Sequence, residues 1–382
     1  MKVLVAGAGL GGLCLAHGLL RAGVDVRVLE REDGPDSRYQ GFRIALNAHG
    51  LAALHACLPE RLHALLAAVS GPLAGERRVV DQELRELRRL GGVDEGTATD
   101  RYVLRRLLLA GLGDRVEFGR PVTGYTERAD GTVEAHLGDG GRAVGDLLVG
   151  ADGVGSAVRR QLLPDARVVT LPGNAVLGRT PLTERSAALV PGYGTVVHGT
   201  DVHGDRASML LGRMEFRRPP RLAAAELAPD VRLPDTGSYL RWVVMPSESL
   251  PAGPRPWETV RAELLALLDG WHPDLVDLVR AADVVNSSPL TVRYAEPVPH
   301  WAGRRRVTLL GDAIHPMPPS GGQGANTALR DAALLARTLT AVQRGTAELP
   351  AAVEQYEQRM LEYGFAAVAD SLERLPDFTP AR

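Results

Sequence analysis

The sequence predicts an α/β protein organised around a nucleotide-binding βαβ unit at its N-terminus. Lys2–Val5 is a short apolar strand, and the segment GAGLGG at residues 7–12 follows it in the spacing GxGxxG. Apolar residues then recur at helical spacing, and Val24–Leu29 alternates as a second strand that ends at Glu30. Two later apolar runs, each followed by an aspartate, indicate further parallel strands of the same sheet.

Each residue type in this unit has a physical role in binding a nucleotide. Gly7 permits a tight turn, Gly9 lets the backbone approach a pyrophosphate, and Gly12 lets the helix pack closely on the strand. The helix N-terminus offers N–H groups to phosphates. Glu30 can accept hydrogen bonds from the hydroxyl groups of a ribose, and its negative charge disfavours the 2′-phosphate of NADP. The chain has 43 glycines, so GxGxxG alone would carry little weight, but strand, helix and acid together favour a nucleotide site.

The composition excludes several classes of function. Basic and acidic residues number 44 and 46, a net charge of −2 that favours neither nucleic acid nor an anionic membrane. Lys2 is the only lysine, so no interior amine is available for Schiff-base chemistry. Cys14 and Cys57 have no partners at metal-ligand spacing, and no metal site is expected. The absence of an 18-residue apolar run predicts a cytoplasmic protein without stable membrane association.

Arginines mark the next two segments. Residues 40–46 are predicted to return across the nucleotide, where Arg43 is either a phosphate or substrate contact or a surface residue. A helix is predicted from Arg101, with Asp100 as its N-cap. Arg101 and Arg105 share one face of that helix and could clamp a pyrophosphate, or could form a solvated charged face.

Three alternating segments between residues 115 and 137 predict antiparallel strands. The apolar run at 146–150 predicts a central parallel strand, with a turn at Asp152 and a helix opened by Ser156. Residues 168–286 predict a mixed region of longer strands and amphipathic helices that has no glycine motif and is suited to covering a pocket.

A second decisive stretch begins at Val307–Leu310, a buried strand. Gly311 and Asp312 lie at its C-terminal end, where open α/β sheets place ligands. A proline-rich loop leads to a helix from about Ala325 to Leu339, and its N-terminus points at whatever lies beside the loop. His315 is predicted to be a loop histidine held by backbone rather than a general base.

Three motifs in this order resemble one family. GAGLGG with its acid, DLLVGADGVGSAVR and LLGDAIHPMPPSGGQGANTALRDA together resemble the single-component FAD-dependent monooxygenases of the para-hydroxybenzoate hydroxylase type, over Met1 to about Leu339. In length the chain is more similar to the salicylate-hydroxylase-like and tetracycline-inactivating members. The resemblance implies a Rossmann-like FAD-binding domain with an inserted mixed-sheet substrate domain and a C-terminal helical segment. The expected division is FAD-binding parts at 1–75, 98–167 and 287–340, connecting strands at 76–97, the substrate domain at 168–286 and C-terminal helices at 341–382.

The resemblance also implies which residues hold FAD. The glycine loop and Glu30 hold its ADP half, the helix with the pattern RxxLR lies beside the ribityl-phosphate, and the loop before the last helix covers the flavin ring. Asp152 belongs to a stretch that the family associates with both FAD and NAD(P)H. Ala48-His49-Gly50 departs from the Pro-Asn-Gly turn of the family. The implied cofactor-binding residues are Gly7, Gly9, Leu10, Gly11, Gly12, Glu30, Arg31, Arg43, Arg101, Arg105, Asp152, Gly311, Asp312, Gly324, Ala325 and Asn326.

The implied activity is a monooxygenase that uses NAD(P)H and O₂. NAD(P)H reduces FAD, O₂ forms a flavin C4a-hydroperoxide, and one oxygen atom enters an organic substrate, expected to be an aromatic or polyketide-like natural product. His49, His198 and His203 are available as bases, but no motif selects one, so no catalytic residue is assigned.

Two other functions are compatible with the same fold. They are a flavin-dependent reductase of isoprenoid or other apolar substrates and a non-enzymatic binding protein like the GDP-dissociation inhibitors. A flavin-dependent halogenase is disfavoured, because there is no interior lysine and Trp242 is followed by Val-Val-Met-Pro.

Overall fold

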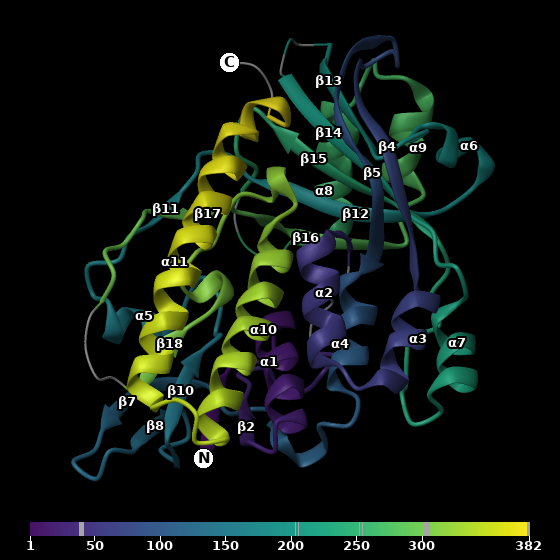
Figure 1. The fold of residues 1–382 in the computed structure, drawn as a ribbon. Helices are drawn as coiled ribbons and strands as arrows, with labels where there is room; N and C mark the ends of the chain where they lie inside the picture. The colour runs from purple at the N-terminus through teal and green to yellow at the C-terminus, as the bar shows by residue number, and fades with distance from the viewer. Residues whose placement is uncertain are drawn as a thin grey trace.

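The computed structural model describes residues 1–37, 42–202, 204, 206–251, 253, 255–301 and 306–379. Gln40, Gly41 and His203 therefore lie outside the described residues. Figure 1 shows a smaller sheet with helices at the N-terminal end of the molecule and a larger sheet at the other end, with α11 (Leu349–Glu373) running alongside both. Among the described helices, none is long and apolar enough to cross a membrane.

The smaller sheet is wholly parallel in the described chain, in the order β18-β10-β1-β2-β6. It confirms the parallel strands predicted at the N-terminus, at 146–150 and at 307–310. One prediction was wrong: Val116–Glu117 does not join an antiparallel set but pairs in parallel with β2. The helix α4 (Arg101–Leu109) precedes it and is the last helix of the long crossover that parallel pairing requires. The strands are β1 (Lys2–Ala6), β2 (Asp25–Leu29), β6 (Val116–Glu117), β10 (Leu147–Gly150) and β18 (Val307–Leu309).

Helices cover this sheet, and small residues set their spacing. A Cβ at Gly18 would lie 2.6 Å from the Cβ of Ala336, so α1 and α10 touch nearly backbone to backbone. Figure 1 shows these two helices side by side, with α11 packed along α10. The helices around the smaller sheet are α1 (Leu10–Arg21), α2 (Ala48–Cys57), α3 (Glu60–Ala68), α4 (Arg101–Leu109), α5 (Ala157–Leu162), α10 (Gly324–Gln343) and α11 (Leu349–Glu373).

The larger sheet has the strand order β16-β12-β15-β14-β13-β4-β5-β3. Its neighbours are antiparallel except for β13 and β4. Residues 43–46 and 70–75 belong to this sheet, so its strands begin earlier in the chain than residue 76. The strands are β3 (Arg43–Leu46), β4 (Ser70–Asp81), β5 (Glu86–Asp100), β12 (Ala175–Pro181), β13 (Gly194–Thr200), β14 (Arg206–Met214), β15 (Tyr239–Pro246) and β16 (Val284–Leu290).

The remaining elements are peripheral. The antiparallel strands predicted at 122–137 form a three-stranded sheet with a third strand after them. These strands are β7 (Val122–Glu127), β8 (Val133–Leu137) and β9 (Arg142–Gly145), and β11 (Val168–Thr170) pairs with β17 (Arg293–Ala295). The other helices are α6 (Glu184–Ala188), α7 (Pro220–Leu227), α8 (Trp257–Leu267) and α9 (Pro273–Arg280), with 3₁₀ turns η1 (Gly113–Arg115), η2 (Gly311–Ala313), η3 (Pro319–Gly321) and η4 (Leu375–Asp377).

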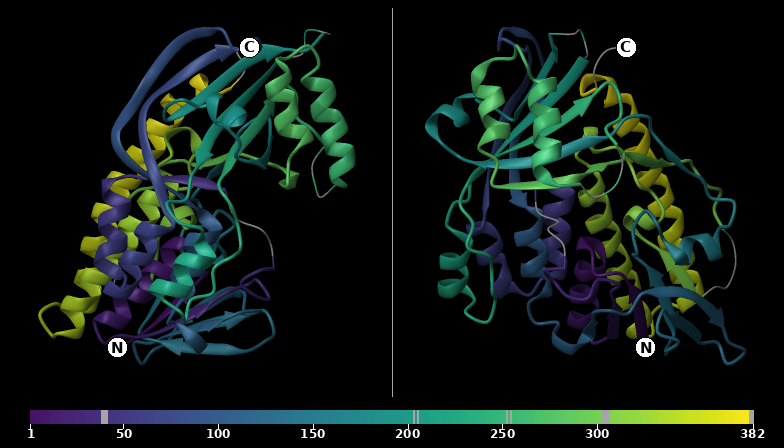
Figure 2. Two further views of the ribbon diagram at one scale, coloured as in Figure 1. Left: turned by 90° about the vertical axis from the view of Figure 1, so that its right-hand side faces the viewer. Right: turned by 180° about the vertical axis from the view of Figure 1, so that it is seen from behind.

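A second hydrophobic core lies between the larger sheet and α8 and α9, which Figure 2 shows side by side. Trp242 on β15 is its largest fully buried side chain. The indole Nε1 donates to Thr180 Oγ1 at 3.2 Å, and the ring lies 6.4 Å from that of Trp257. This core therefore supports the face of the larger sheet that lies away from the smaller sheet.

We expect Gly178→Ala to lower the free energy of unfolding by about 1–3 kcal/mol, because a Cβ there would overlap the ring of Trp242. Urea denaturation followed by circular dichroism would measure the change. Gly237→Ala is the matched control, since nothing lies within 4 Å of its added Cβ. Equal midpoints for the two variants would show that the core tolerates the extra methyl group.

Candidate active site

A single cavity of about 750 Å³ joins the two sheets. At one end it is lined by the N-terminus of α1, the loop after β10, the turn η2 and the N-terminus of α10. At the other end it is lined by strands of the larger sheet and by residues of the C-terminal turn, including Leu375 and Phe378. A ligand in this space can therefore touch both layers of the molecule.

The glycine loop is packed tightly at two positions and open at the third. Gly7 has φ of 108°, and a Cβ at Gly12 would overlap the carbonyl oxygen of Gly7. An added Cβ at Gly9, by contrast, meets nothing within 4 Å. Gly9 is also the N-cap of α1, with no side-chain hydrogen bond to the helix amides. The loop therefore leaves open space in front of uncapped amides, which suits a pyrophosphate.

Glu30 is fixed beside that loop. Its side chain is 6% exposed, and its two oxygens accept hydrogen bonds from Ala8 N at 2.5 Å and Glu32 N at 2.9 Å. A carboxylate has further lone pairs, so these bonds leave acceptor capacity for ribose hydroxyls. Arg31, the next residue, is exposed.

The two arginines of α4 have different surroundings. Asp100 caps the helix as predicted, and its carboxylate accepts from Val103 N at 2.9 Å. Arg105 is 2% exposed; its Nε donates to Ala8 O at 3.0 Å and its Nη2 lies 2.9 Å from a carboxylate oxygen of Glu32. Arg105 thus holds the glycine loop to the segment after β2. Arg101 is exposed and lines the cavity.

The carboxylate of Asp152 serves the start of α5. One oxygen accepts from Ala157 N at 2.8 Å and from Val158 N at 3.4 Å, and Ser156 caps the same helix as predicted. The flanking residues Ala151 and Gly153 line the cavity. Asp152 therefore shapes the loop that carries them.

The loop after β18 and the start of α10 face the cavity together. Gly311 has φ of 60°, and Asp312 is exposed into the cavity. Gly324 and Ala325 also line it, and α10 has no side-chain cap at its N-terminus. Its first amides and the positive end of its dipole are thus directed at the cavity.

Asn326 connects this helix to the other layer. Its amide nitrogen donates to Ala45 O at 2.8 Å and Gly322 O at 2.9 Å, and its oxygen accepts from Asn47 N at 3.0 Å. A Cβ at Gly50 would overlap that oxygen. The turn that departs from the family pattern therefore keeps a glycine where the fit is closest.

His315 lies in a buried network that the sequence did not predict. Instead of binding backbone through its side chain, its Nε2 lies 2.8 Å from Oδ2 of Asp331 on α10. The same carboxylate accepts from Gly311 N at 2.8 Å and from the hydroxyl of Tyr363 on α11 at 2.7 Å. Burial opposes the charged imidazole, but Asp331 outweighs it, so the pKa of His315 is raised above its ordinary value. A buried acid within an apolar helix face was the available signal for Asp331.

At the far end, Arg43 lies in the larger sheet among residues that motif analysis missed. Its side chain is 7% exposed, and Nη2 donates to Tyr193 O at 3.1 Å. Arg77 and Arg241 line the same end of the cavity. Of the histidines considered as bases, His49 is exposed and His198 contacts Ser208 Oγ at 2.8 Å. Neither is among the described residues that line the cavity.

Known proteins share these features. A family described as an FAD binding domain matches residues 1–48 and 238–371. The FAD-dependent urate hydroxylase of Klebsiella pneumoniae is 31% identical over 371 residues, which cover 94% of this chain and 85% of that protein. This chain belongs to the FAD-dependent monooxygenases. The dual O-methyltransferase/FAD-dependent monooxygenase CTB3 of Cercospora beticola is 33% identical over 94% of the chain, and the chain spans less than half of its length, 44%.

Solved structures agree with this membership of the monooxygenase family. A Photorhabdus luminescens protein assigned as an FAD-containing monooxygenase has a TM-score of 0.82 and 30% identity, over 99% of this chain and 98% of that one. Klebsiella pneumoniae HpxO in complex with FAD and uric acid has a TM-score of 0.73 and 26% identity, over 98% and 87%. The open space at Gly9 and the uncapped amides of α1 fit the cofactor of this family.

We expect Gly9→Ala to fold normally but to bind FAD at least about tenfold more weakly, a cost of about 1.4 kcal/mol. The backbone at Gly9 has φ of −76°, which alanine adopts, so the methyl group would occupy only ligand space. Flavin fluorescence titration would measure the affinity. Gly91→Ala, also in open space but not among the residues that line the cavity, is the control. Unchanged FAD affinity would place the pyrophosphate elsewhere.

We expect His315→Gln to be less stable than the native chain by about 3 kcal/mol or more below pH 6.5, since it breaks a buried charge pair. Because the folded pKa is raised, the stabilisation is complete below the unfolded value of about 6.5 and is lost as pH rises through the folded pKa. The stability difference should therefore shrink as pH rises. Urea denaturation across pH, with exposed His49→Gln as control, would measure it; a constant difference would contradict the charged pair.

Proposed function

We propose that this protein is an FAD- and NAD(P)H-dependent monooxygenase that inserts one oxygen atom of O₂ into an organic substrate. The observation that carries the proposal is the continuity of the cavity. One space runs from the nucleotide loop at Gly9 to an apolar surface of the larger sheet that includes Leu210, Val243 and Met245. Family membership supports the cofactor, and the cavity supplies a place for a substrate beside it.

Different parts of the cavity would bind FAD and the substrate. The α1 amides and Glu30 hold the ADP portion of FAD, and Arg105 keeps the glycine loop in shape. Amides at the start of α10 would hold the flavin ring, where the helix dipole would stabilise negative charge. When bound, the flavin supplies the redox chemistry of oxygen activation. The chain itself orients the substrate and excludes water with the apolar strands and Phe378.

The reductant and the substrate class follow from resemblance and from the lining. NAD(P)H is proposed as a transient electron donor, because the segment around Asp152 resembles one that the family associates with both nucleotides. The substrate is proposed to be an aromatic or polyketide-like natural product. The names of relatives point the same way: one hydroxylates urate, and another is an aurachin C monooxygenase/isomerase of Stigmatella aurantiaca.

We expect the purified protein to be yellow or to become so with FAD, to be bleached by NADPH or NADH, and to be recoloured by air. Visible spectra and oxygen uptake would measure this. A monooxygenase needs O₂ for product, whereas a reductase would consume NAD(P)H with substrate under anaerobic conditions. A colourless protein that takes up no FAD would contradict the proposal and favour a binding protein on the same fold.

A further inference from the structure

Three arginines from separate strands meet at the end of the cavity that lies in the larger sheet. They are Arg43 on β3, Arg77 on β4 and Arg241 on β15, and all three line the cavity. Gly212 on β14 pairs with Arg241 and makes room for Arg43, whose Nη1 lies 2.7 Å from where a Cβ of Gly212 would be. Because Gly212 has no side chain, the guanidinium group of Arg43 can lie against β14, next to β15 and its Arg241.

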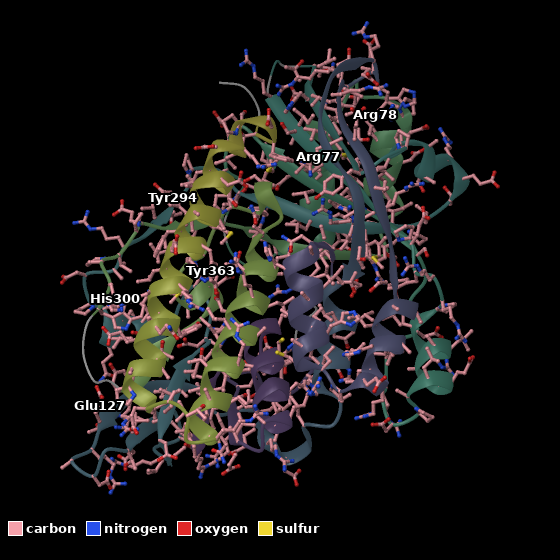
Figure 3. The ribbon with its side chains drawn as sticks, in the orientation of Figure 1. Arg77, Arg78, Glu127, Tyr294, His300 and Tyr363 are labelled. Carbon is pink, nitrogen blue, oxygen red and sulfur yellow. The ribbon has the colours of Figure 1, made fainter. Side chains whose placement is uncertain are left out.

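Aromatic rings contact two of these guanidinium groups, those of Arg77 and Arg43. The Cζ of Arg77 lies 4.6 Å from the ring centroid of Tyr193 and 4.7 Å from that of Phe378. Arg43 has its Cζ 5.5 Å from the Tyr193 ring and also donates to Tyr193 O. Such contacts orient a guanidinium without neutralising its charge. Figure 3 labels Arg77 and its neighbour Arg78 on β4; Arg78 instead donates to Leu189 O and Thr195 Oγ1.

Within the described part of the chain, none of the three arginines forms an ion pair with a carboxylate. Asp377, whose charge reaches Arg77, is itself paired with Arg88 at 2.9 Å. The Nε atoms of Arg43 and Arg241 are buried without a hydrogen-bond partner. Burial and the charges of Arg241 and Arg77 lower the pKa of Arg43 to about 10. Buried, unpaired charges of one sign are costly, and a ligand of the opposite sign would offset that cost.

We propose that the substrate carries a negative charge, as a carboxylate or as an ionised enol or phenol, and that Arg43, Arg77 and Arg241 bind it. This inference rests on the proposed function, because it names the substrate class of the same cavity. Guanidinium groups form paired, charge-assisted hydrogen bonds with such oxygens. The arginines would thus fix the substrate at the end of the cavity opposite α1, and three cations would favour the ionised form of an acidic hydroxyl. The phosphates of NAD(P)H are the other possible source of an anion.

The test compares two ligands of equal shape and different charge. The FAD-loaded protein is titrated calorimetrically with 2-naphthoate and with its neutral amide, 2-naphthamide. We expect the native chain to bind the acid at least about tenfold more tightly than the amide. Arg241→Met should bring the two affinities close together by weakening only the acid, and Arg77→Met should act in the same direction. Retained amide binding shows that the variants are folded, and Arg241→Lys should keep part of the preference.

Arg213→Met is the matched control, because Arg213 lies on the adjacent strand but pairs with Glu215 at 3.2 Å and does not line the cavity. It should leave both affinities unchanged. Equal binding of acid and amide by the native chain would overturn the inference. So would arginine variants that weaken NADPH or NADH and spare 2-naphthoate. Flavin reduction and oxygen uptake are measured separately, so loss of those activities with a retained acid preference would count against the proposed function alone.

Discussion

The carboxylate of Asp331 holds together three parts of the chain that must meet for the cavity to exist. It lies on α10, accepts from the backbone of Gly311 after β18, pairs with His315 in the following loop and accepts from Tyr363 on α11. Gly364, the next residue of α11, packs so closely that a Cβ would lie 2.6 Å from the imidazole of His315. A charge buried at this depth needs all of its partners, so the loop, the two helices and the parallel sheet are fixed as one unit.

The two ends of the cavity use opposite solutions to hold charge. At the end beside Gly9, the cavity is faced by uncapped backbone amides and the positive end of the α1 dipole. The charge of Arg105 is paired there with Glu32 of the same chain. At the sheet end, full charges on long side chains are offered, and aromatic faces take the place of carboxylate partners. Apolar side chains such as Leu210, Val243 and Met245 also line the cavity, which suits chemistry that must exclude water.

Much of the first layer could be predicted, because its signals are local. A strand, a glycine turn, a helix and a terminal acid are adjacent in sequence, and the strand at 307–310 with its loop is equally compact. The strands of the second layer were also predicted, but its cluster of Arg77, Tyr193 and Arg241 was not, since these residues come together only through the pairing of distant strands. Val116–Glu117 was wrongly predicted to be antiparallel, because its partner strand is also distant in the sequence. The alternation of apolar and polar residues does not show whether the partner strand is parallel or antiparallel. His315 was misjudged because its partner, Asp331, lies in the following helix.

The turn η4 places Leu375 and Phe378 in the wall of the cavity, whereas Met1 lies at the opposite end of the molecule (Figure 1). Substitutions near Leu375 and Phe378 should therefore affect the cavity more than substitutions near Met1. A change between Leu375 and Thr379 would alter the wall beside Arg77, whereas a change at Met1 would be separated from that wall by the smaller sheet.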